Sequence, residues 1–321
     1  MREILFLEPV FKEMIWGGRR LKDVYGYDIP GDDTGECWAI SAHPSGDCTV
    51  REGRFQGMSL SGLWNSRREL FGGLSGEVFP LLVKIIDARD DLSIQVHPDD
   101  TYAGLHENGA LGKTECWYIL DAPSGGEIVI GHHAKDHEQV EEMIRGKKWD
   151  SFIRKVPVKK GDFFQINPGC VHAIKGGTLI LETQQNSDIT YRVYDYDRLS
   201  GGSPRQLHVE QSIDVIKAPF VPAANDFCTD EGDGWNITRL VSCPYYSVYK
   251  LHLEQSYEFE QVHPFINVSV IDGEGTVDAH PVRKGCHFIL PADYGICRFE
   301  GSMTLICSIP GLETAEDTAW L

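Results

Sequence analysis

The sequence contains no long apolar run. No stretch of the 321 residues approaches the roughly 18 consecutive apolar residues that a membrane-spanning helix requires. Residues 1–18 also carry neither the apolar segment nor the small-residue cleavage site of a secretory signal. We therefore expect a soluble, cytoplasmic protein that has no membrane partner.

Paired cysteines are also missing. The nine cysteines are scattered and form no C-x-x-C pair and no regular framework. An odd, dispersed set in a chain of this length is typical of reduced, mostly buried thiols. A catalytic thiol at Cys116 or Cys170 is the less favoured alternative.

Basic clusters are absent as well. The formal net charge is -18, and no cluster of lysines and arginines offsets it. This charge repels nucleic acid and anionic membranes, so neither is an expected partner. A small anionic substrate remains compatible with it, provided that a few cations converge locally. Nothing in the composition indicates the oligomeric state.

The sequence does contain many short β-rich runs punctuated by Gly, Pro and Asp. Segments 58–72, 135–156 and 208–217 are predicted to be helical from their apolar spacing. The remaining runs favour sandwiches or barrels, with a polar, acidic boundary at 223–235. Strands are predicted at 79–87, 116–122, 126–131, 161–166, 178–185, 189–196, 246–253, 266–277, 286–291 and 303–309.

One pattern occurs twice. Residues 159–174 (KKGDFFQINPGCVHAI) align with residues 283–298 (RKGCHFILPADYGICR), and each copy is a lysine-glycine turn that leads into a strand ending at a proline. The pattern resembles the second motif of the cupin superfamily, whose strand delivers a histidine into the mouth of a small barrel. The resemblance implies a mainly β protein with two cupin-like (jelly-roll) β-barrels and a few helices inserted in the N-terminal half. We expect a catalytic, metal-binding domain at 1–222 and a second, metal-free domain at 235–321.

The second copy lacks the histidine. His172 of the first copy aligns with Ile296 of the second. A second QVHP tetrapeptide, at 261–264, therefore has no imidazole at 296 to complete a site. We predict that His263 is a surface or structural residue.

Metal chemistry is therefore expected in the first barrel. In LSIQVHPDD (92–100), Gln95 and His97 lie two residues apart and would share one face of a strand. Glu115 and His172 lie on two further predicted strands. Two imidazoles, a carboxylate and an amide oxygen could bind zinc or iron and leave an open position. The alternative is that these are ordinary polar residues on separate strands.

Several motifs together carry a more specific resemblance. The segments LETQQNSDITYRVYDYDR (181–198), FPLLVKIID, LSIQVHPDD, GKTECWYI and GECWAISAHP (35–44) resemble those of type I mannose-6-phosphate isomerases of the short bacterial form, in order and spacing, over essentially the whole chain. The resemblance implies an enzyme of carbohydrate metabolism, and specifically of mannose metabolism. Its expected reaction is the interconversion of mannose 6-phosphate and fructose 6-phosphate, a sugar phosphate being the expected small-molecule partner.

The same resemblance assigns roles to individual residues. It implies one Zn²⁺ per chain, an active-site arginine at Arg192, an acidic position at Glu182, and lysines near the substrate at Lys84 and Lys113. One departure is that the cupin Pro-x-Gly appears here as Asn-Pro-Gly at 167–169. The implied zinc ligands are Gln95, His97, Glu115 and His172.

The implied reaction moves a proton between C1 and C2 of the sugar through an enediol. A base must lie within about 3 Å of the carbon-bound hydrogen, and positive charge must meet the enediolate oxygen. Glu182, His97 and Lys113 are the candidate bases, with Glu182 preferred. Without the resemblance, the favoured interpretation of Arg192 is a solvated arginine paired with Asp188 or Asp195.

Two other functions are compatible with two histidines and a carboxylate in a cupin. One is an iron-dependent dioxygenase, which would consume oxygen. The other is a catalytically silent sugar-phosphate sensor, because binding modules also use this fold.

Overall fold

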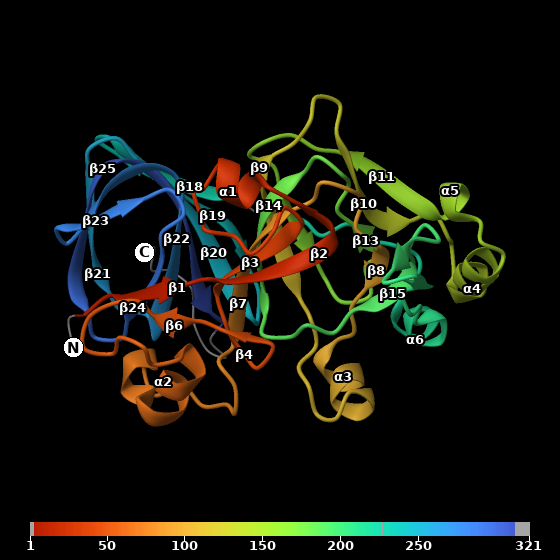
Figure 1. The fold of residues 1–321 in the computed structure, drawn as a ribbon, viewed down its shortest axis with the longest axis horizontal. Coiled ribbons are helices and arrows are strands. Elements are labelled where there is room, and N and C mark those ends of the chain that lie inside the picture. Colours follow the sequence, from red (N-terminus) through yellow and green to blue (C-terminus); the bar gives the residue numbers. More distant parts are fainter. Residues whose placement is uncertain (1–2, 226, 312–321) are drawn as a thin grey trace.

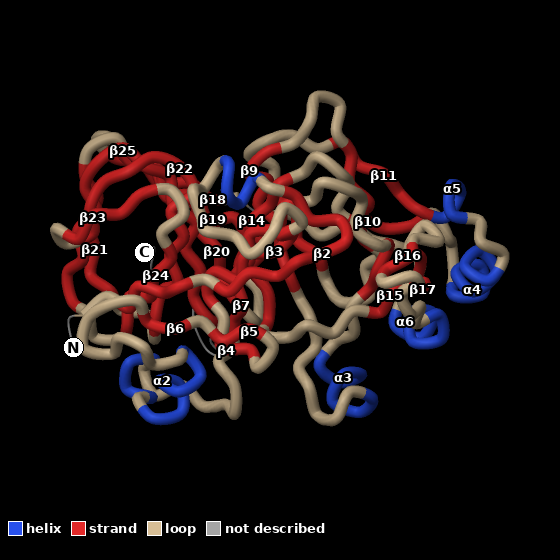
Figure 2. Tube along the Cα trace, viewed as in Figure 1, coloured by secondary structure: helices blue, strands red, loops and turns tan. Residues whose placement is uncertain are grey.

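The structure, a computed structural model, describes residues 3–225 and 227–311. Strands dominate it, as Figure 2 shows, and the predicted mainly β architecture is confirmed. Every strand predicted from the sequence overlaps an observed strand. Among the described residues, no helix combines the length and the apolar character needed to cross a membrane.

Two of the predicted helices are confirmed. The segment 58–72 forms α2 (Leu60–Ser66) and a 3-10 turn, and the Ser59 hydroxyl caps α2 by accepting a hydrogen bond from the Gly62 N–H. The segment 208–217 contains α6 (Val209–Val215). Two further helices, α1 (Arg20–Asp23) and α3 (Asp100–His106), were not predicted from the sequence. The Asp99 carboxylate is the N-cap of α3.

The third predicted helix is shorter than expected. Only α4 (His137–Arg145) and the single turn α5 (Trp149–Phe152) are helical within 135–156. The chain leaves α4 at Gly146, and Lys147 has a positive φ of 51°, which ends the helix. The rest of the segment is strand β11 (Ile153–Pro157), so the prediction of one long helix is wrong there.

Two antiparallel sheets make up most of the N-terminal lobe. The six-stranded sheet has the order β12-β9-β14-β7-β3-β2, and the five-stranded sheet has the order β11-β10-β13-β8-β15. Two short strand pairs, β4 with β5 and β16 with β17, lie outside them. The strands of this lobe besides β11 are β2 (Val10–Gly18), β3 (Thr34–Ile40), β4 (Ala42–His43), β5 (Gly46–Asp47), β7 (Leu81–Asp87), β8 (Ile94–Val96), β9 (Glu115–Asp121), β10 (Glu127–His132), β12 (Phe163–Ile166), β13 (His172–Ala173), β14 (Leu179–Gln185), β15 (Tyr191–Tyr194), β16 (Leu199–Ser200) and β17 (Ser203–Pro204).

A ten-stranded sheet forms the other lobe, and its strands curve around that lobe in Figure 1. Its main path is β18-β19-β20-β25-β22-β24-β1-β6, with β21 paired to β25 and β23 paired to β22. The N-terminal strand β1 pairs with β24, so the chain begins in the sheet that its C-terminal half builds. The strands are β1 (Leu5–Glu8), β6 (Thr49–Val50), β18 (Cys228–Gly232), β19 (Trp235–Ser242), β20 (Tyr246–Leu253), β21 (Ser256–Gln261), β22 (Phe265–Val277), β23 (His280–Arg283), β24 (His287–Pro291) and β25 (Gly295–Pro310).

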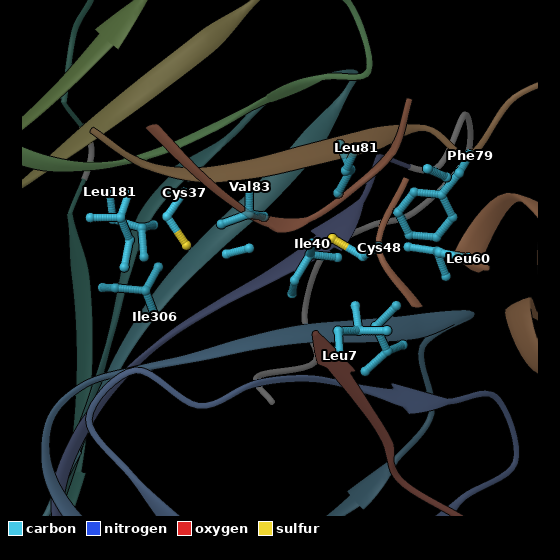
Figure 3. Close-up of a cluster of buried hydrophobic side chains, with 14 of the residues drawn as sticks. Leu7, Cys37, Ile40, Cys48, Leu60, Phe79, Leu81, Val83, Leu181 and Ile306 are labelled. Carbon is cyan, nitrogen blue, oxygen red and sulfur yellow. The ribbon is translucent and has the colours of Figure 1, made fainter. Parts of the chain in front are cut away.

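The six-stranded sheet is covered on both faces. One face packs on side chains of the ten-stranded sheet, and Figure 3 shows Val83, Leu181 and Ile306 together in this shared core. The other face packs Ile86 and Ile119 against the inner side of the five-stranded sheet. All seven residues of β7 are therefore buried, which explains why its sequence is nearly continuous in apolar residues. The charged residues on the face of the six-stranded sheet that packs against the five-stranded sheet mark the functional site.

Candidate active site and metal centre

Four side chains of the six-stranded sheet form one row across neighbouring strands. Glu182 in β14 pairs directly with Trp117 in β9 on one side and with Lys84 in β7 on the other. Lys84 in turn pairs with Trp38 in β3. Directly opposite residues in a sheet point to the same face, so an indole, a carboxylate, an ammonium and a second indole line up side by side.

The five-stranded sheet contributes a second row. Gln95 in β8 pairs with His172 in β13 and with Arg192 in β15. Apolar Ile94 and Val96, on the other face of β8, pack with the core outside this row. The alternation predicted for LSIQVHPDD is thus present, and it turns Gln95 toward the six-stranded sheet.

His97, Glu115 and His172 meet between the two sheets. One candidate ligand atom from each lies within 4.8 Å of the others. The two imidazole Nε2 atoms are 3.1 Å apart, and the Glu115 carboxylate oxygens lie 3.5 Å from that of His97 and 3.4 Å from that of His172. The Gln95 amide is 3.3 Å from His172 Nε2. The structure therefore brings together all four residues predicted as ligands.

The protonation states of the two histidines allow them to bind one cation together. The His172 Nδ1–H donates to the Cys170 carbonyl at 2.9 Å, which leaves a lone pair on Nε2. Burial lowers the pKa of His172 to about 4, so the ring is neutral. Burial likewise holds the pKa of His97 well below its ordinary value, with Lys113 adding to the effect. Two neutral imidazoles and a carboxylate aimed at one point are a donor set for a divalent metal ion.

Lys113 adjoins the metal centre. Its ammonium lies 2.6 Å from Glu115 and 3.1 Å from His97 Nε2. Burial raises the pKa of Glu115 to about 7, with the Glu182 charge adding to the rise and Lys113 opposing it. The Lys113 pKa is raised, because Glu115 and Glu182 together outweigh the burial of the ammonium. The two carboxylates therefore favour the charged form of Lys113 next to the centre.

Lys84 lies between two carboxylates. Its ammonium is 3.7 Å from Glu182 and 3.9 Å from Glu36, over the Trp38 ring. Burial alone would raise the pKa of Glu182, but Lys113, Lys84 and the Trp117 indole lower it overall. Glu182 is consequently ionised although it is almost fully buried.

A cavity of about 190 Å³ opens over this region. Its wall includes four cationic and three anionic side chains, a local excess of cations in a chain of net charge -18. The cations are Lys84, Lys113, Arg192 and Arg205, and the anions are Glu36, Glu182 and Asp188.

Arg192 is half-buried at the cavity wall. Its guanidinium donates to the Gln206 carbonyl at 2.9 Å, and its Nε is buried without a hydrogen-bond partner. Burial, together with the neighbouring Arg205 charge, lowers the pKa of Arg192. Asp195, the partner that a solvated ion pair would use, instead accepts hydrogen bonds from Arg198 and Arg205.

Several residues of this site were not predicted from the sequence. Glu36 and Trp38 lie two apart in GECWAISAHP, a motif that was noted only as a whole, and the alternation within it could have placed them on one face. Trp117 could have been found in the same way from its spacing to Glu115. Arg205 carries no local signal, because the short pair β16–β17 brings it back to the cavity. Burial raises the pKa of the thiol alternatives, Cys116 and Cys170, that of Cys170 to about 12, which disfavours the thiolate that a nucleophile needs.

Comparison with known proteins gives consistent matches. Residues 4–139 match the phosphomannose isomerase type I catalytic domain, and residues 236–310 match the mannose-6-phosphate isomerase cupin domain. The chain is 49% identical to the mannose-6-phosphate isomerase ManA of Bacillus subtilis, over 95% of this chain and 98% of that protein. It is 48% identical to the mannose-6-phosphate isomerase of Streptococcus mutans, over 96% and 98%. A crystal structure of the Bacillus subtilis mannose 6-phosphate isomerase superposes with a TM-score of 0.93 at 47% identity, covering 95% of this chain and 99% of the other.

Proposed function

The chain belongs to the type I phosphomannose isomerase family and is a mannose-6-phosphate isomerase, and from this premise we propose how its own residues convert the substrate to fructose 6-phosphate. The comparisons support the isomerase and neither the iron-dependent dioxygenase nor the silent sensor. The observation that carries the proposal is the convergence of His97, Glu115 and His172 beside a cation-rich cavity.

We propose one Zn²⁺ per chain at this centre. Gln95, His97, Glu115 and His172 would hold it, since neutral imidazole nitrogen and carboxylate oxygen are ligands that suit zinc. When bound, the ion supplies positive charge beside the oxygen on which the enediolate charge develops.

The reacting carbons would lie between the two rows of side chains. The ionised Glu182 takes the proton from C2 of the open-chain aldose, and the C2–H electron pair becomes the C1–C2 double bond of the enediolate. Protonated Glu182, whose proton can exchange with solvent, donates a proton to C1, and the O2 hydroxyl proton passes to O1 as the C2–O carbonyl of the ketose forms, so no redox partner is needed. Lys113 and Lys84 lie within 3.9 Å and 3.7 Å of the Glu182 carboxylate, where their ammonium groups can bind the substrate oxygens.

The phosphate would bind at the arginine side of the cavity. Arg192 and Arg205 both face this space, and their mutual repulsion is relieved by a dianion between them. Binding the phosphate there anchors the remote end of the sugar and orients C1 and C2 toward Glu182.

Two proposals concern the whole chain. We propose that residues 1–222 form the catalytic domain and residues 235–321 a second, metal-free domain, with β1 reaching across to the second sheet. A cytoplasmic location is supported by the nine cysteines, all of which are free thiols in the structure.

The test is turnover of mannose 6-phosphate by the purified protein, coupled to detection of fructose 6-phosphate, with metal analysis of the same sample. We expect turnover in air and under nitrogen alike, with about one zinc per chain. No turnover by metal-loaded protein would reject the function.

The base assignment has its own test. Glu182→Gln should abolish exchange of the C2 hydrogen with solvent and leave the metal bound, because Gln keeps the shape and loses the basic oxygen. Glu138→Gln on the exposed face of α4 is the matched control and should exchange normally. Unimpaired exchange in Glu182→Gln would remove that residue as the base.

A further inference from the structure

The two oxygens of the Glu182 carboxylate have different surroundings. Oε2 accepts a hydrogen bond of 2.8 Å from the Trp117 indole N–H. Oε1 is buried and makes no hydrogen bond, and it lies 3.7 Å from the Lys84 ammonium and 3.9 Å from that of Lys113. One oxygen is therefore held by an indole, and the other faces the cations of the cavity.

Trp117 is a rigid donor. Its side chain is fully buried, and its ring meets the His172 ring edge-on at 5.5 Å and 75°. It also lies directly opposite Glu182 across the β9–β14 pair, so the sheet fixes the spacing between the indole and the carboxylate. Rotating the indole away would disturb the packing around His172 and Ile119.

We propose that Trp117 is a positioning residue that selects Oε1 of Glu182 as the oxygen that carries the proton between C2 and C1. This inference rests on the proposed role of Glu182 as the base. With Oε2 bound to the indole, rotation of the carboxylate about its last bond would break that hydrogen bond, and Oε1 stays beside the two ammonium groups that line the cavity. One proton site on a fixed oxygen serves two neighbouring carbons without reorientation of the base.

The second carboxylate beside Lys84 shows that an indole alone does not create this arrangement. Trp38 donates to Glu36 Oε2 at 2.6 Å, but Lys84 approaches that same oxygen, at 3.9 Å. The Trp38 indole and the Lys84 ammonium thus approach the same oxygen of Glu36. At Glu182, the Trp117 indole binds one oxygen and the Lys84 ammonium lies near the other. Of these two carboxylates, Glu182 is the one whose indole-free oxygen faces both ammonium groups.

The proposal is tested first with Trp117→Phe, which removes the N–H donor. We expect kcat to fall about 10- to 100-fold, the effect of losing one hydrogen bond to a charged group. KM and the metal content should stay within about twofold of the parent, because binding groups are untouched. Trp64→Phe is the matched control: Trp64 is also a fully buried tryptophan, but its indole nitrogen has no hydrogen-bond partner, so kcat should not change.

A second substitution at Trp117 distinguishes loss of the N–H donor from a folding defect. Replacing Trp117 with β-(3-benzothienyl)alanine keeps the ring shape and removes only the N–H, so it should reproduce the kcat loss with the parent thermal stability. Equal kcat in this variant and in the parent enzyme would overturn the proposal.

A double-mutant cycle shows whether Trp117 acts through Glu182. Adding Trp117→Phe to Glu182→Gln should cost nothing further in turnover measured over long incubations, because the group that Trp117 positions is already gone. An additive loss would overturn the role of Trp117. Full turnover by Glu182→Gln alone would reject the assignment of Glu182 as the base. Normal turnover by Trp117→Phe would reject only the role of Trp117, so the two failures can be told apart.

Discussion

The tetrapeptide Gln-Val-His-Pro occurs twice, in two lobes, and takes two different structures. At 95–98 its first two residues lie in β8, which runs between β13 and β15 in the five-stranded sheet, and His97 follows the end of that strand. At 261–264 it begins at the last residue of β21 and leaves the sheet. Gln95 and His97 reach the metal centre from the first position, while Gln261 and His263 make no such centre within the described residues.

The difference lies in what the glutamine amide contacts. Gln95 points at His172 across the strand pair. The Gln261 amide instead makes its hydrogen bonds to backbone groups. It donates to the His263 and Pro291 carbonyls at 2.9 and 2.7 Å and accepts from the His263 N–H at 2.7 Å. The second copy is therefore a strand-ending turn, and His263 is a buried part of that turn.

The partner position differs as well. His172 is fully buried between strands, whereas Ile296, its counterpart in the internal repeat, is 55% exposed on β25. A ligand set needs several strands to deliver side chains to one point. A short motif carries chemistry only where its neighbours across the sheet complete it.

Removing one histidine from each copy should give the largest contrast. His97→Ala deletes one of three buried ligand groups, and we expect bound metal to fall below one per chain and turnover to drop at least about 10³-fold. His263→Ala should retain both metal and turnover. Elemental analysis and the coupled assay measure the two effects. A metal-loaded His97→Ala enzyme, or a metal-free His263→Ala enzyme, would break the comparison.

Replacing the glutamine of each copy should affect stability in the second copy and catalysis in the first. Gln261→Leu removes three buried hydrogen bonds to backbone, and we expect the free energy of unfolding to fall by about 2–4 kcal/mol with kcat unchanged. Gln95→Leu should lower kcat and change stability by less than about 1 kcal/mol. Urea denaturation with a chelator present measures stability without the contribution of metal binding. Equal destabilisation by the two substitutions would contradict the different roles.

Restoring the missing histidine should have the smallest effect. Ile296→His recreates the pattern of the first copy in the sequence, but the side chain is exposed and Gln261 remains bound to backbone. Metal content should stay at one per chain, and stability should change by no more than about 0.5 kcal/mol. A second bound metal ion would show that the sequence motif is sufficient after all.

Much of the fold follows from local patterns. The strand predictions hold because β-rich runs bounded by Gly and Pro have few alternatives. The prediction for 135–156 fails at its C-terminal end, because residues 153–157 gain more by pairing with β10 than by extending a helix. The short helix α3 begins directly after Asp99 in LSIQVHPDD, and no helix was predicted at that position.

The site divides in the same way. The four expected ligands come together, because each sits on or beside a strand whose alternation was visible in the sequence. The roles of Trp117 and Arg205 were not visible. One depends on the register between β9 and β14, and the other on a short hairpin that returns to the cavity.

The sequence by itself determined where many of the strands lie, the alternation that places Gln95 on one face of its strand, and a family resemblance that implies the ligand set. These are properties of neighbouring residues, and a period of two along a strand is enough to read them. Tertiary structure alone decided that the Gln261 amide bonds to backbone in the second QVHP copy and which oxygen of Glu182 faces the two lysines. Both depend on residues far apart in the chain, whose pairing is fixed only when the sheets assemble.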